Sequence, residues 1–258
     1  MASSRPVVLV TGAARRLGRA IALELGAHGF DLAVHCRRST DEAQDTVDTL
    51  RTLGAAAEAF AADLVDDAAC RALVPAVVRR FGRLDAVVNN ASSFEHDDAF
   101  TAAPAEMDRQ WRTNTAPAVL LAQALHAQLH GCSELGCVVN LLDQKLWNPN
   151  PDHFSYTLSK AALQAATVML AQALAPQVRV CGVAPGVTLP SGPMDDAAFA
   201  AAHRMTPLGR SSTPDDIARA VRFLIESPAI TGTTLIVDGG QHLSGQPRDV
   251  MFLPRAEA

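Results

Sequence analysis

The apolar positions of this 258-residue chain follow two alternating patterns. Short continuous apolar runs are typical of buried strands, and longer stretches in which apolar residues recur every three or four positions are typical of amphipathic helices. The runs predict strands at residues 6–11, 31–36, 56–62, 84–89, 136–142, 178–184 and 233–237. The periodic stretches predict helices near residues 17–28, 41–53, 66–81, 104–130, 154–175 and 214–226. Because the two kinds of element alternate, we expect an α/β fold in which one doubly wound, seven-stranded parallel sheet carries helices on both faces.

One long segment, residues 187–213, has no clear strand pattern and is rich in Pro, Gly, Ser and Ala. Segments of this kind either connect elements across the surface or carry function. The rest of the chain shows no internal repeat and no linker, so we expect a single domain spanning residues 1–258.

Length and composition limit what the chain can do. With 48% hydrophobic residues, it can bury a sizeable core in one domain. The net charge of -5 and the scattered arginines argue against a nucleic-acid partner. No apolar run approaches the length of a membrane span, and Met1 to Pro6 is too short and polar for a secretory signal. We therefore expect a cytoplasmic protein without a membrane partner.

Cysteine and histidine spacing gives no metal motif. The chain has an odd number of cysteines and no C-x-x-C spacing, which predicts reduced, mostly buried thiols at Cys36, Cys70, Cys132, Cys137 and Cys181. His126 and His130 are four residues apart but lack the glutamate of a zinc-protease helix, so an exposed helix face is expected. The run His96-Asp97-Asp98 is expected to be a solvated loop, and no metal site is predicted.

The chain contains one tyrosine, Tyr156, and two lysines, Lys145 and Lys160. Lys160 follows Tyr156 by four residues, so their side chains share one face of a predicted helix. A nearby ammonium favours the phenolate and lowers the pKa of a tyrosine. Such a tyrosine can deliver a proton near neutral pH. The alternative is an ordinary exposed helix pair, because Tyr-x-x-x-Lys also arises by chance.

Asp143 follows the apolar run 137–142, at the carboxyl end of a predicted strand. Open parallel sheets present their ligand-binding groups at that end. A carboxyl there can bind an N–H edge of a substrate, or carry a proton when neighbours raise its pKa. Asp143 opposes the phenolate of Tyr156 and Lys160 favours it, so the three groups are expected to titrate as a unit. Nitrogen heterocycles fit this site better than simple ketones, and a drifted, inactive site is the alternative.

The first predicted strand runs into the turn Thr11-Gly12-Ala13-Ala14-Arg15-Arg16-Leu17-Gly18, and an amphipathic helix follows. A strand, a glycine turn and a helix together aim backbone N–H groups and the helix dipole at a pyrophosphate. Arg16 is a bulky cation inside this tight turn and needs a partner. It is expected to bind phosphate or to reach the substrate.

The end of the second predicted strand indicates the cofactor. An acidic residue there would bind the ribose 2′-hydroxyl of NADH and repel a 2′-phosphate. The chain has instead His35-Cys36-Arg37-Arg38-Ser39, with no acid in place. Two guanidinium groups and a hydroxyl suit a phosphate, so NADPH is preferred over NADH. The alternative is that Arg37 and Arg38 form a solvated turn.

Together these segments resemble the short-chain dehydrogenase/reductase family over almost the whole chain. The matching residues, in family order, are Thr11-Gly12 to Gly18, Asp63-Leu64, Asn89-Asn90-Ala91, Asn114, Tyr156-Lys160, Pro185-Gly186 and Asp238-Gly239-Gly240. Most members have glycine in place of Arg16, glycine in place of Ser92 and serine in place of Asp143. These departures, with the run Asn89 to Phe94, resemble the pteridine reductases and the bacterial dihydromonapterin reductases.

The resemblance implies a Rossmann-type fold, a homotetramer and a mobile substrate lid at residues 187–213. The residues expected to bind the cofactor are Gly12, Arg16, Leu17, Gly18, His35, Arg37, Arg38, Ser39, Asp63, Leu64, Asn90, Ala91, Ser92, Tyr156, Lys160, Pro185, Gly186 and Thr188. The residues expected to bind the substrate are Arg16, Ser92, Phe94, Asp143, Trp147 and Tyr156. Trp147 has no counterpart in the resemblance, and loop packing or an interface is its alternative role. The catalytic set is Asp143, Tyr156, Lys160 and Asn114, with Asn114 positioning Lys160 through water.

These expectations predict NADPH-dependent reduction of a pteridine. The substrate would be a dihydropterin such as dihydromonapterin or dihydrobiopterin, or dihydrofolate, stacked between the nicotinamide and Phe94. Hydride would reach a C=N bond, and the proton would pass through Asp143, Tyr156 and Lys160. Two alternatives remain: an NADPH-dependent reductase of ketones or 3-oxoacyl substrates, and a catalytically silent NADPH-binding sensor.

Overall fold

The computed structural model of the protein describes residues 5–191 and 194–253. Its strands are β1 (Val7–Val10), β2 (Asp31–Cys36), β3 (Ala57–Ala61), β4 (Ala86–Asn89), β5 (Gly136–Leu141), β6 (Val178–Pro185) and β7 (Thr234–Val237). They form one seven-stranded sheet in the order β3-β2-β1-β4-β5-β6-β7. Every neighbouring pair is parallel, so the predicted fold class is confirmed.

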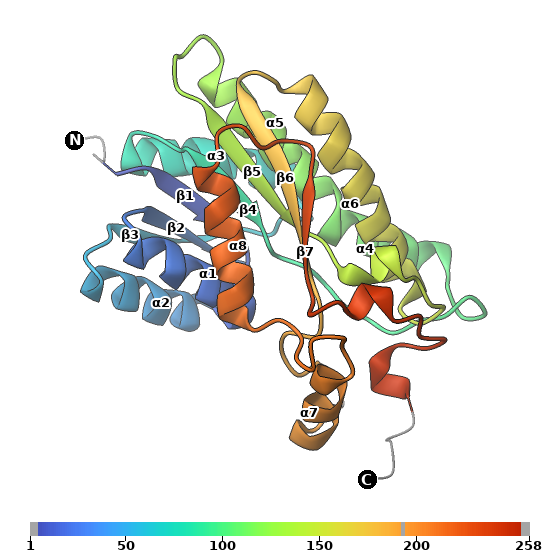
Figure 1. The fold of residues 1–258 in the computed structure, drawn as a ribbon. Coiled ribbons are helices and arrows are strands. Elements are labelled where there is room, and N and C mark those ends of the chain that lie inside the picture. The colour runs from blue at the N-terminus through green and yellow to red at the C-terminus, as the bar shows by residue number, and fades with distance from the viewer. Residues whose placement is uncertain (1–4, 192–193, 254–258) are drawn as a thin grey trace.

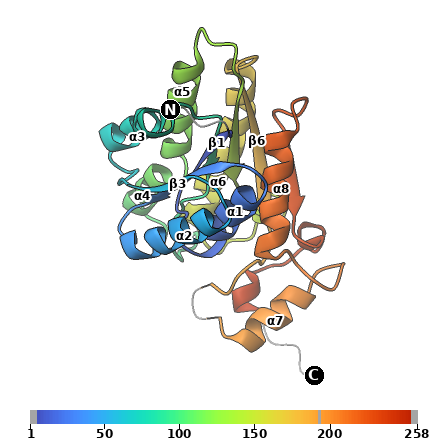
Figure 2. The same cartoon turned by 90° about the vertical axis from the view of Figure 1, so that its left-hand side faces the viewer.

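Helices cover both faces of this sheet (Figures 1 and 2). The helices are α1 (Arg16–Ala27), α2 (Thr40–Thr52), α3 (Asp67–Phe81), α4 (Pro104–Asn114), α5 (Ala116–Leu129), α6 (Phe154–Ala173), α7 (Asp196–Arg204) and α8 (Pro214–Glu226). The apolar cores place α1, α2 and α8 on one face and α3, α5 and α6 on the other. Helix α4 packs beside α6.

The strand β1 shows why the sheet is buried on both sides. Successive side chains of a strand point to opposite faces. Val8 and Val10 belong to the core under α1, α2 and α8, whereas Val7 and Leu9 belong to the core under α3, α5 and α6. All four side chains are fully buried. A continuous apolar run is therefore the pattern that a strand between two helical layers requires.

The single helix predicted over residues 104–130 is wrong in one respect, because the chain forms two helices there. Helix α4 ends at Asn114 and α5 begins at Ala116, with Thr115 between them. Pro117 lies in the first turn of α5, and proline cannot donate the backbone hydrogen bond that a continuous helix needs. Thr115 instead donates its hydroxyl to the carbonyl of Ser159 at 2.8 Å, which fixes the break against α6.

The described part of the segment 187–213 contains a helix and no strand. Asp195 accepts a hydrogen bond from the amide of Ala198 at 2.7 Å and so caps the start of α7. After β7 the chain continues through two short 3-10 helices, η2 (Gln241–Leu243) and η3 (Val250–Phe252). Helix α7 and η3 lie side by side at one end of the molecule (Figures 1 and 2).

The order of the strands reverses between β1 and β4, which flank each other although β2 and β3 intervene in sequence. In open parallel sheets, ligands bind at the carboxyl ends of the strands beside such a reversal.

Four of the five cysteines are buried free thiols, and Cys132 is exposed, which agrees with the predicted mostly buried thiols. Among the described residues, none of the helices has the length and apolar character needed to cross a membrane.

Candidate active site

Two adjoining hollows open at the carboxyl ends of the central strands. The first is a cavity of about 280 Å³. The predicted residues that line it are Arg16, Leu17, Asn90, Ser92, Phe94, Asp143, Tyr156, Lys160, Pro185, Gly186 and Thr188. The predicted residues that line the second hollow are Gly12, Arg16, Leu17, Gly18, His35, Arg37, Arg38, Ser39, Asp63, Leu64, Asn90, Ala91 and Ser92. The fold thus brings together, in these two hollows, every residue predicted to bind the cofactor, from six separate stretches of the chain.

Three side chains in the first cavity form a polar cluster. The hydroxyl of Tyr156 donates a hydrogen bond to Oδ2 of Asp143 at 2.9 Å. The ammonium of Lys160 donates to the carbonyl of Leu141 at 2.7 Å and lies 5.7 Å from the centre of the Tyr156 ring. Helix α6 supplies Tyr156 and Lys160, and the end of β5 supplies Asp143. Of the predicted Asp143, Tyr156 and Lys160 group, Asp143 and Tyr156 are joined by a hydrogen bond, whereas Lys160 donates to a backbone carbonyl.

Burial dominates the electrostatics of this cluster. It raises the pKa of Asp143, and burial together with the adjacent Asp143 carboxyl raises the pKa of Tyr156 well above its usual value. Burial also lowers the pKa of Lys160 to about 8. The expectation that Lys160 lowers the pKa of Tyr156 is therefore wrong for this arrangement. Both shifts favour the protonated form of the oxygen atoms, which is the form that a proton donor requires.

Asn114 lies behind the cavity and does not line it. Its Nδ2 donates to the carbonyl of Ser93 at 3.1 Å and to the hydroxyl of Ser159 at 3.0 Å. Its Oδ1 accepts from the hydroxyl of Ser92 at 3.0 Å. Asn114 therefore fixes the turn after β4 against α6. The predicted positioning of Lys160 by Asn114 through water stays a prediction, and the contact with Ser159 places Asn114 beside the helix that carries Lys160.

The glycine turn after β1 is shaped as a close-fitting cradle. Gly12 has a φ of +64°, and a Cβ on Gly18 would lie 2.2 Å from the carbonyl oxygen of Gly12. The amide of Gly12 donates to Nδ1 of His35 at 3.1 Å. Because Nδ1 accepts, the proton of this buried, neutral imidazole lies on Nε2, which meets the carbonyl of Ala62 at 3.0 Å. His35 supports the turn from beneath.

Arg16 occupies a strained position in the same turn. Its φ is +54°, in the left-handed region that glycine adopts more easily than arginine. Its guanidinium donates to the carbonyl of Pro190 at 2.8 Å and lines both hollows. Arg16 thus links the glycine turn to the segment 187–213 and presents a cation where the two hollows meet. Its predicted contacts with a phosphate and with the substrate stay predictions.

Aromatic rings form one wall of the first cavity. Phe94 meets the Tyr156 ring edge-on with centroids 4.7 Å apart, and it stacks on His153 with centroids 4.0 Å apart. Phe94 is 38% exposed and so presents ring surface to the cavity. Trp147, also predicted to bind the substrate, is not among the residues that line either hollow, so its role stays a prediction. It is the last residue of the 3-10 helix η1 (Gln144–Trp147) and is 37% exposed.

The loop that precedes α4 is only partly solvated, contrary to the prediction for His96-Asp97-Asp98. Asp97 is buried and accepts hydrogen bonds from the backbone amide and the hydroxyl of Ser155, which fastens the loop to the start of α6. Asp98 remains exposed and accepts from Thr101. Among the described residues, no group of three or more potential ligands could hold a metal ion.

Sequence reasoning missed several cavity residues. Lys145, Gln144 and Asp249 line the same cavity as Asp143, and His153 stacks behind Phe94. Burial lowers the pKa of His153, whose Nδ1 meets the carbonyl of Glu95 at 2.9 Å. The rarity of lysine was the available signal for Lys145. Nothing in the local sequence connects Asp249 with a strand that ends more than a hundred residues earlier.

Comparisons with known proteins agree with this geometry. The sequence model of a family described as enoyl-(acyl carrier protein) reductase matches residues 12–242. A protein from Streptomyces violaceoruber, assigned as ketoacyl reductase 2 of the granaticin polyketide synthase, is 34% identical over 94% of this chain and 98% of its own length.

Two solved structures are similar in both sequence and fold. FolM alternative dihydrofolate reductase 1 from Brucella suis, in complex with NADP, is 41% identical and superposes with a TM-score of 0.89 over 95% of this chain and 98% of that chain. The same enzyme from Brucella canis, also complexed with NADP, is 41% identical with a TM-score of 0.86 over 93% and 95%.

Proposed function

This chain belongs to the short-chain dehydrogenase/reductase family, and we propose that it is an NADPH-dependent reductase of pteridines. The substrate is a dihydropterin such as dihydromonapterin or dihydrobiopterin, or dihydrofolate. The observation that carries this proposal is the hydrogen bond between Asp143 and Tyr156 beside the exposed face of Phe94. Similarity to the two FolM dihydrofolate reductases supports the same substrate class.

The residues of the second hollow fit NADPH. The positive φ of Gly12 and the lack of room for a Cβ on Gly18 both require glycine, and a turn without these side chains lets a pyrophosphate approach the backbone closely. Helix α1 begins there without a side-chain cap, and its first amides are available to an anion. Arg37 and Arg38 line the hollow after β2, with no acid among the neighbouring residues of that strand end. This charge pattern favours a 2′-phosphate.

NADPH, when bound, supplies a hydride to a C=N bond, and the chain must then supply a proton. Tyr156 delivers that proton, and Asp143 replenishes it through their hydrogen bond. Asp143 also binds the N–H edge of the heterocycle, which a serine hydroxyl would bind less well. Lys160 holds the ammonium charge beside Tyr156, and Phe94 stacks on the flat ring.

The segment 187–213 serves as a lid over the substrate. Leu189, Ser191 and Met194 line the first cavity, and Arg16 binds the carbonyl of Pro190. Residues 192 and 193, within this segment, lie outside the described residues.

A homotetramer is the expected assembly. Helices α4 and α6 pack together and expose large apolar side chains, namely Trp111, Leu158, Val168 and Met169. Exposed apolar groups of this size mark contact surfaces. Light scattering on the purified protein measures its molar mass in solution, and a mass four times that of one chain is expected.

A carbonyl reductase acting on 3-oxoacyl substrates is the second candidate, supported by the matched family description and the Streptomyces relative. Turnover separates the two. NADPH oxidation with dihydrobiopterin or dihydromonapterin, and not with an acetoacetyl thioester, supports pteridine reduction. The reverse result supports the carbonyl reductase, and NADPH binding without turnover of either substrate supports a sensor.

A further inference from the structure

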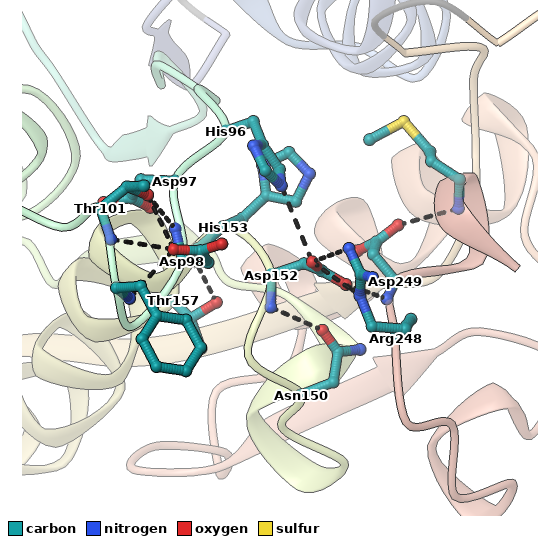
Figure 3. Close-up of polar contacts among 12 residues, drawn as sticks. His96, Asp97, Asp98, Thr101, Asn150, Asp152, His153, Thr157, Arg248 and Asp249 are labelled. Carbon is teal, nitrogen blue, oxygen red and sulfur yellow. Dashed lines mark hydrogen bonds and ion pairs between the residues drawn. The ribbon is translucent and has the colours of Figure 1, made fainter.

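One buried carboxylate holds the C-terminal segment 244–252, in which Asp249, Val250 and Met251 line the first cavity. Asp152 has a side chain that is 2% exposed, and it accepts hydrogen bonds from Nε and Nη2 of Arg248 at 2.7 Å each and from the amide of Asp249 at 2.7 Å (Figure 3). The Arg248 guanidinium lowers the pKa of Asp152 to about 2. The backbone of residues 248–249 is therefore held at a fixed place beside the loop that precedes α6.

Further contacts hold the same segment against η1 and against the aromatic side chains near the cavity. Asn148 donates to the carbonyl of Ser244 at 2.6 Å. The Phe252 ring lies 4.8 Å from His96 and 6.0 Å from His153, centre to centre. His153 in turn stacks on Phe94. The tail is thus packed on the aromatic wall of the cavity rather than lying free on the surface.

This placement brings a second carboxylate into the substrate cavity. Asp249 lines it together with Asp143, and Lys145 connects the two. The backbone amide of Lys145 donates to Oδ1 of Asp143 at 2.8 Å, while its ammonium donates to Oδ2 of Asp249 at 3.2 Å. Lys145 is itself 3% exposed, and its ammonium also donates to the carbonyl of Asp152. A single residue therefore joins both carboxyl groups.

Charged and titratable groups from four elements surround Asp143 in the first cavity. Helix α6 contributes Tyr156 and Lys160, η1 contributes Lys145, the C-terminal segment contributes Asp249, and the start of α1 contributes Arg16 at the cavity wall. His153 faces the Asp249 side of the cluster. Among the described residues of this set, Asp249 is the only carboxyl group besides Asp143 itself. It disfavours negative charge on Asp143 and on Tyr156, so it raises the pKa values of both, whereas Lys145 opposes this effect on Asp143.

We propose that Asp249, paired with Lys145, is a positioning residue that sets the pH range over which the Asp143–Tyr156 pair keeps its proton for delivery. The proposal rests on the pteridine reduction proposed above and goes beyond it, because it assigns a role to the C-terminal segment. A like charge strengthens proton retention on a neighbouring buried carboxyl, and an ammonium weakens it. Removing the charge of Asp249 and removing that of Lys145 therefore have opposite effects.

The decisive measurement is an NMR titration of the NADP⁺-bound enzyme carrying carboxyl-labelled aspartate, with Asp143→Asn used to assign the signal of Asp143. Asp249→Asn is expected to lower the titration midpoint of Asp143 by roughly one pH unit. Lys145→Met is expected to raise it, and the double variant is expected to fall between the two. Asp48→Asn is the matched control, since it makes the same substitution at an exposed site on α2. It should leave the midpoint unchanged.

Steady-state kinetics gives the second reading. With dihydrobiopterin as substrate, the rate falls at alkaline pH as the proton donor is lost. This limb of the profile of kcat should move to lower pH in Asp249→Asn and to higher pH in Lys145→Met. Shifts in the NMR midpoint without any pteridine turnover would overturn the proposed function and leave the coupling intact. Unchanged midpoints in an enzyme that reduces pteridines would overturn the coupling alone. If Lys145→Met does not fold, Asp249→Asn against Asp48→Asn decides the question.

Discussion

Tyr156 donates a 2.9 Å hydrogen bond to Asp143, while Lys160, one helical turn away, donates to the carbonyl of Leu141. The phenol is therefore paired with an acid and not with the ammonium that the sequence places beside it. Burial and Asp143 raise the pKa of Tyr156, and burial raises the pKa of Asp143 as well. Both shifts favour retention of a proton, which suits a proton donor and a neighbouring group that resupplies it.

Tyr156→Phe should abolish pteridine reduction and leave NADPH binding nearly intact. Phenylalanine keeps the ring that meets Phe94 and removes only the hydroxyl. Loss of a proton donor typically costs about 10²–10⁴-fold in rate. Fluorescence titration of NADPH and single-turnover kinetics measure the two properties separately. Substantial turnover in this variant would show that the proton arrives by another route.

Asp143→Asn should lower kcat/KM for dihydrobiopterin by roughly 10²-fold, because the amide keeps the shape and cannot carry the proton. Asp143→Ser should lose pteridine reduction as well. The serine restores the residue common in carbonyl-reducing relatives, so weak activity on small ketones is the expected gain. The measurement is kcat/KM between about pH 5 and 8 for both variants and the wild type. Variants that match the wild type throughout would make Asp143 a bystander.

Arg16→Gly and Arg16→Ala separate strain from binding. Both remove the cation at the junction of the hollows, so both should raise the KM values for NADPH and pteridine. Only glycine relieves the left-handed backbone with a φ of +54°. Arg16→Gly should therefore be more stable than Arg16→Ala by about 1 kcal/mol in denaturant unfolding. Equal stabilities would show that the turn carries no strain at this position.

Replacing both Arg37 and Arg38 with alanine should raise the KM for NADPH far more than the KM for NADH. Each charge-assisted hydrogen bond to a phosphate is worth about 1.5–3 kcal/mol. NADH has no 2′-phosphate, so its binding does not depend on these hydrogen bonds. Kinetics with both cofactors in the wild type and the double variant test this expectation. Equal losses for the two cofactors would contradict the assignment.

Asp152→Asn should release the C-terminal segment and remove a pH-dependent contribution to stability. The pKa of Asp152 falls from 3.8 to about 2 on folding, so the carboxylate stabilises the fold fully above pH 3.8 and loses this effect as the pH falls toward 2. Arg248 is half exposed, so solvent screening limits the gain to about 1 kcal/mol. Thermal unfolding should show a lower Tm than the wild type at neutral pH and a shrinking difference below pH 4. Hydrogen exchange should also accelerate in residues 245–252.

The sequence alone determined the framework of this protein. Strands buried on both faces need continuous apolar runs, and helices on the surface of a sheet need a periodic stripe, so both could be recognised locally. The same reason explains why three further features could be recognised from the sequence, namely the glycine turn, the strand end at Arg37 and the Tyr156–Lys160 pair. Each depends on residues that are close together in the chain.

The tertiary structure decided which of these groups meet and how they share protons. Asp143, Tyr156 and Asp249 come from a strand end, a helix and the C-terminal segment, and only folding places them in one cavity. The local sequence predicted that Lys160 would lower the pKa of Tyr156, but the pKa is raised because burial outweighs the attraction of the ammonium. Burial depends on how the whole chain packs. The break at Thr115 and the burial of Asp97 likewise depend on partners distant in sequence. Local pattern fixes the elements, and long-range contact fixes the chemistry at their ends.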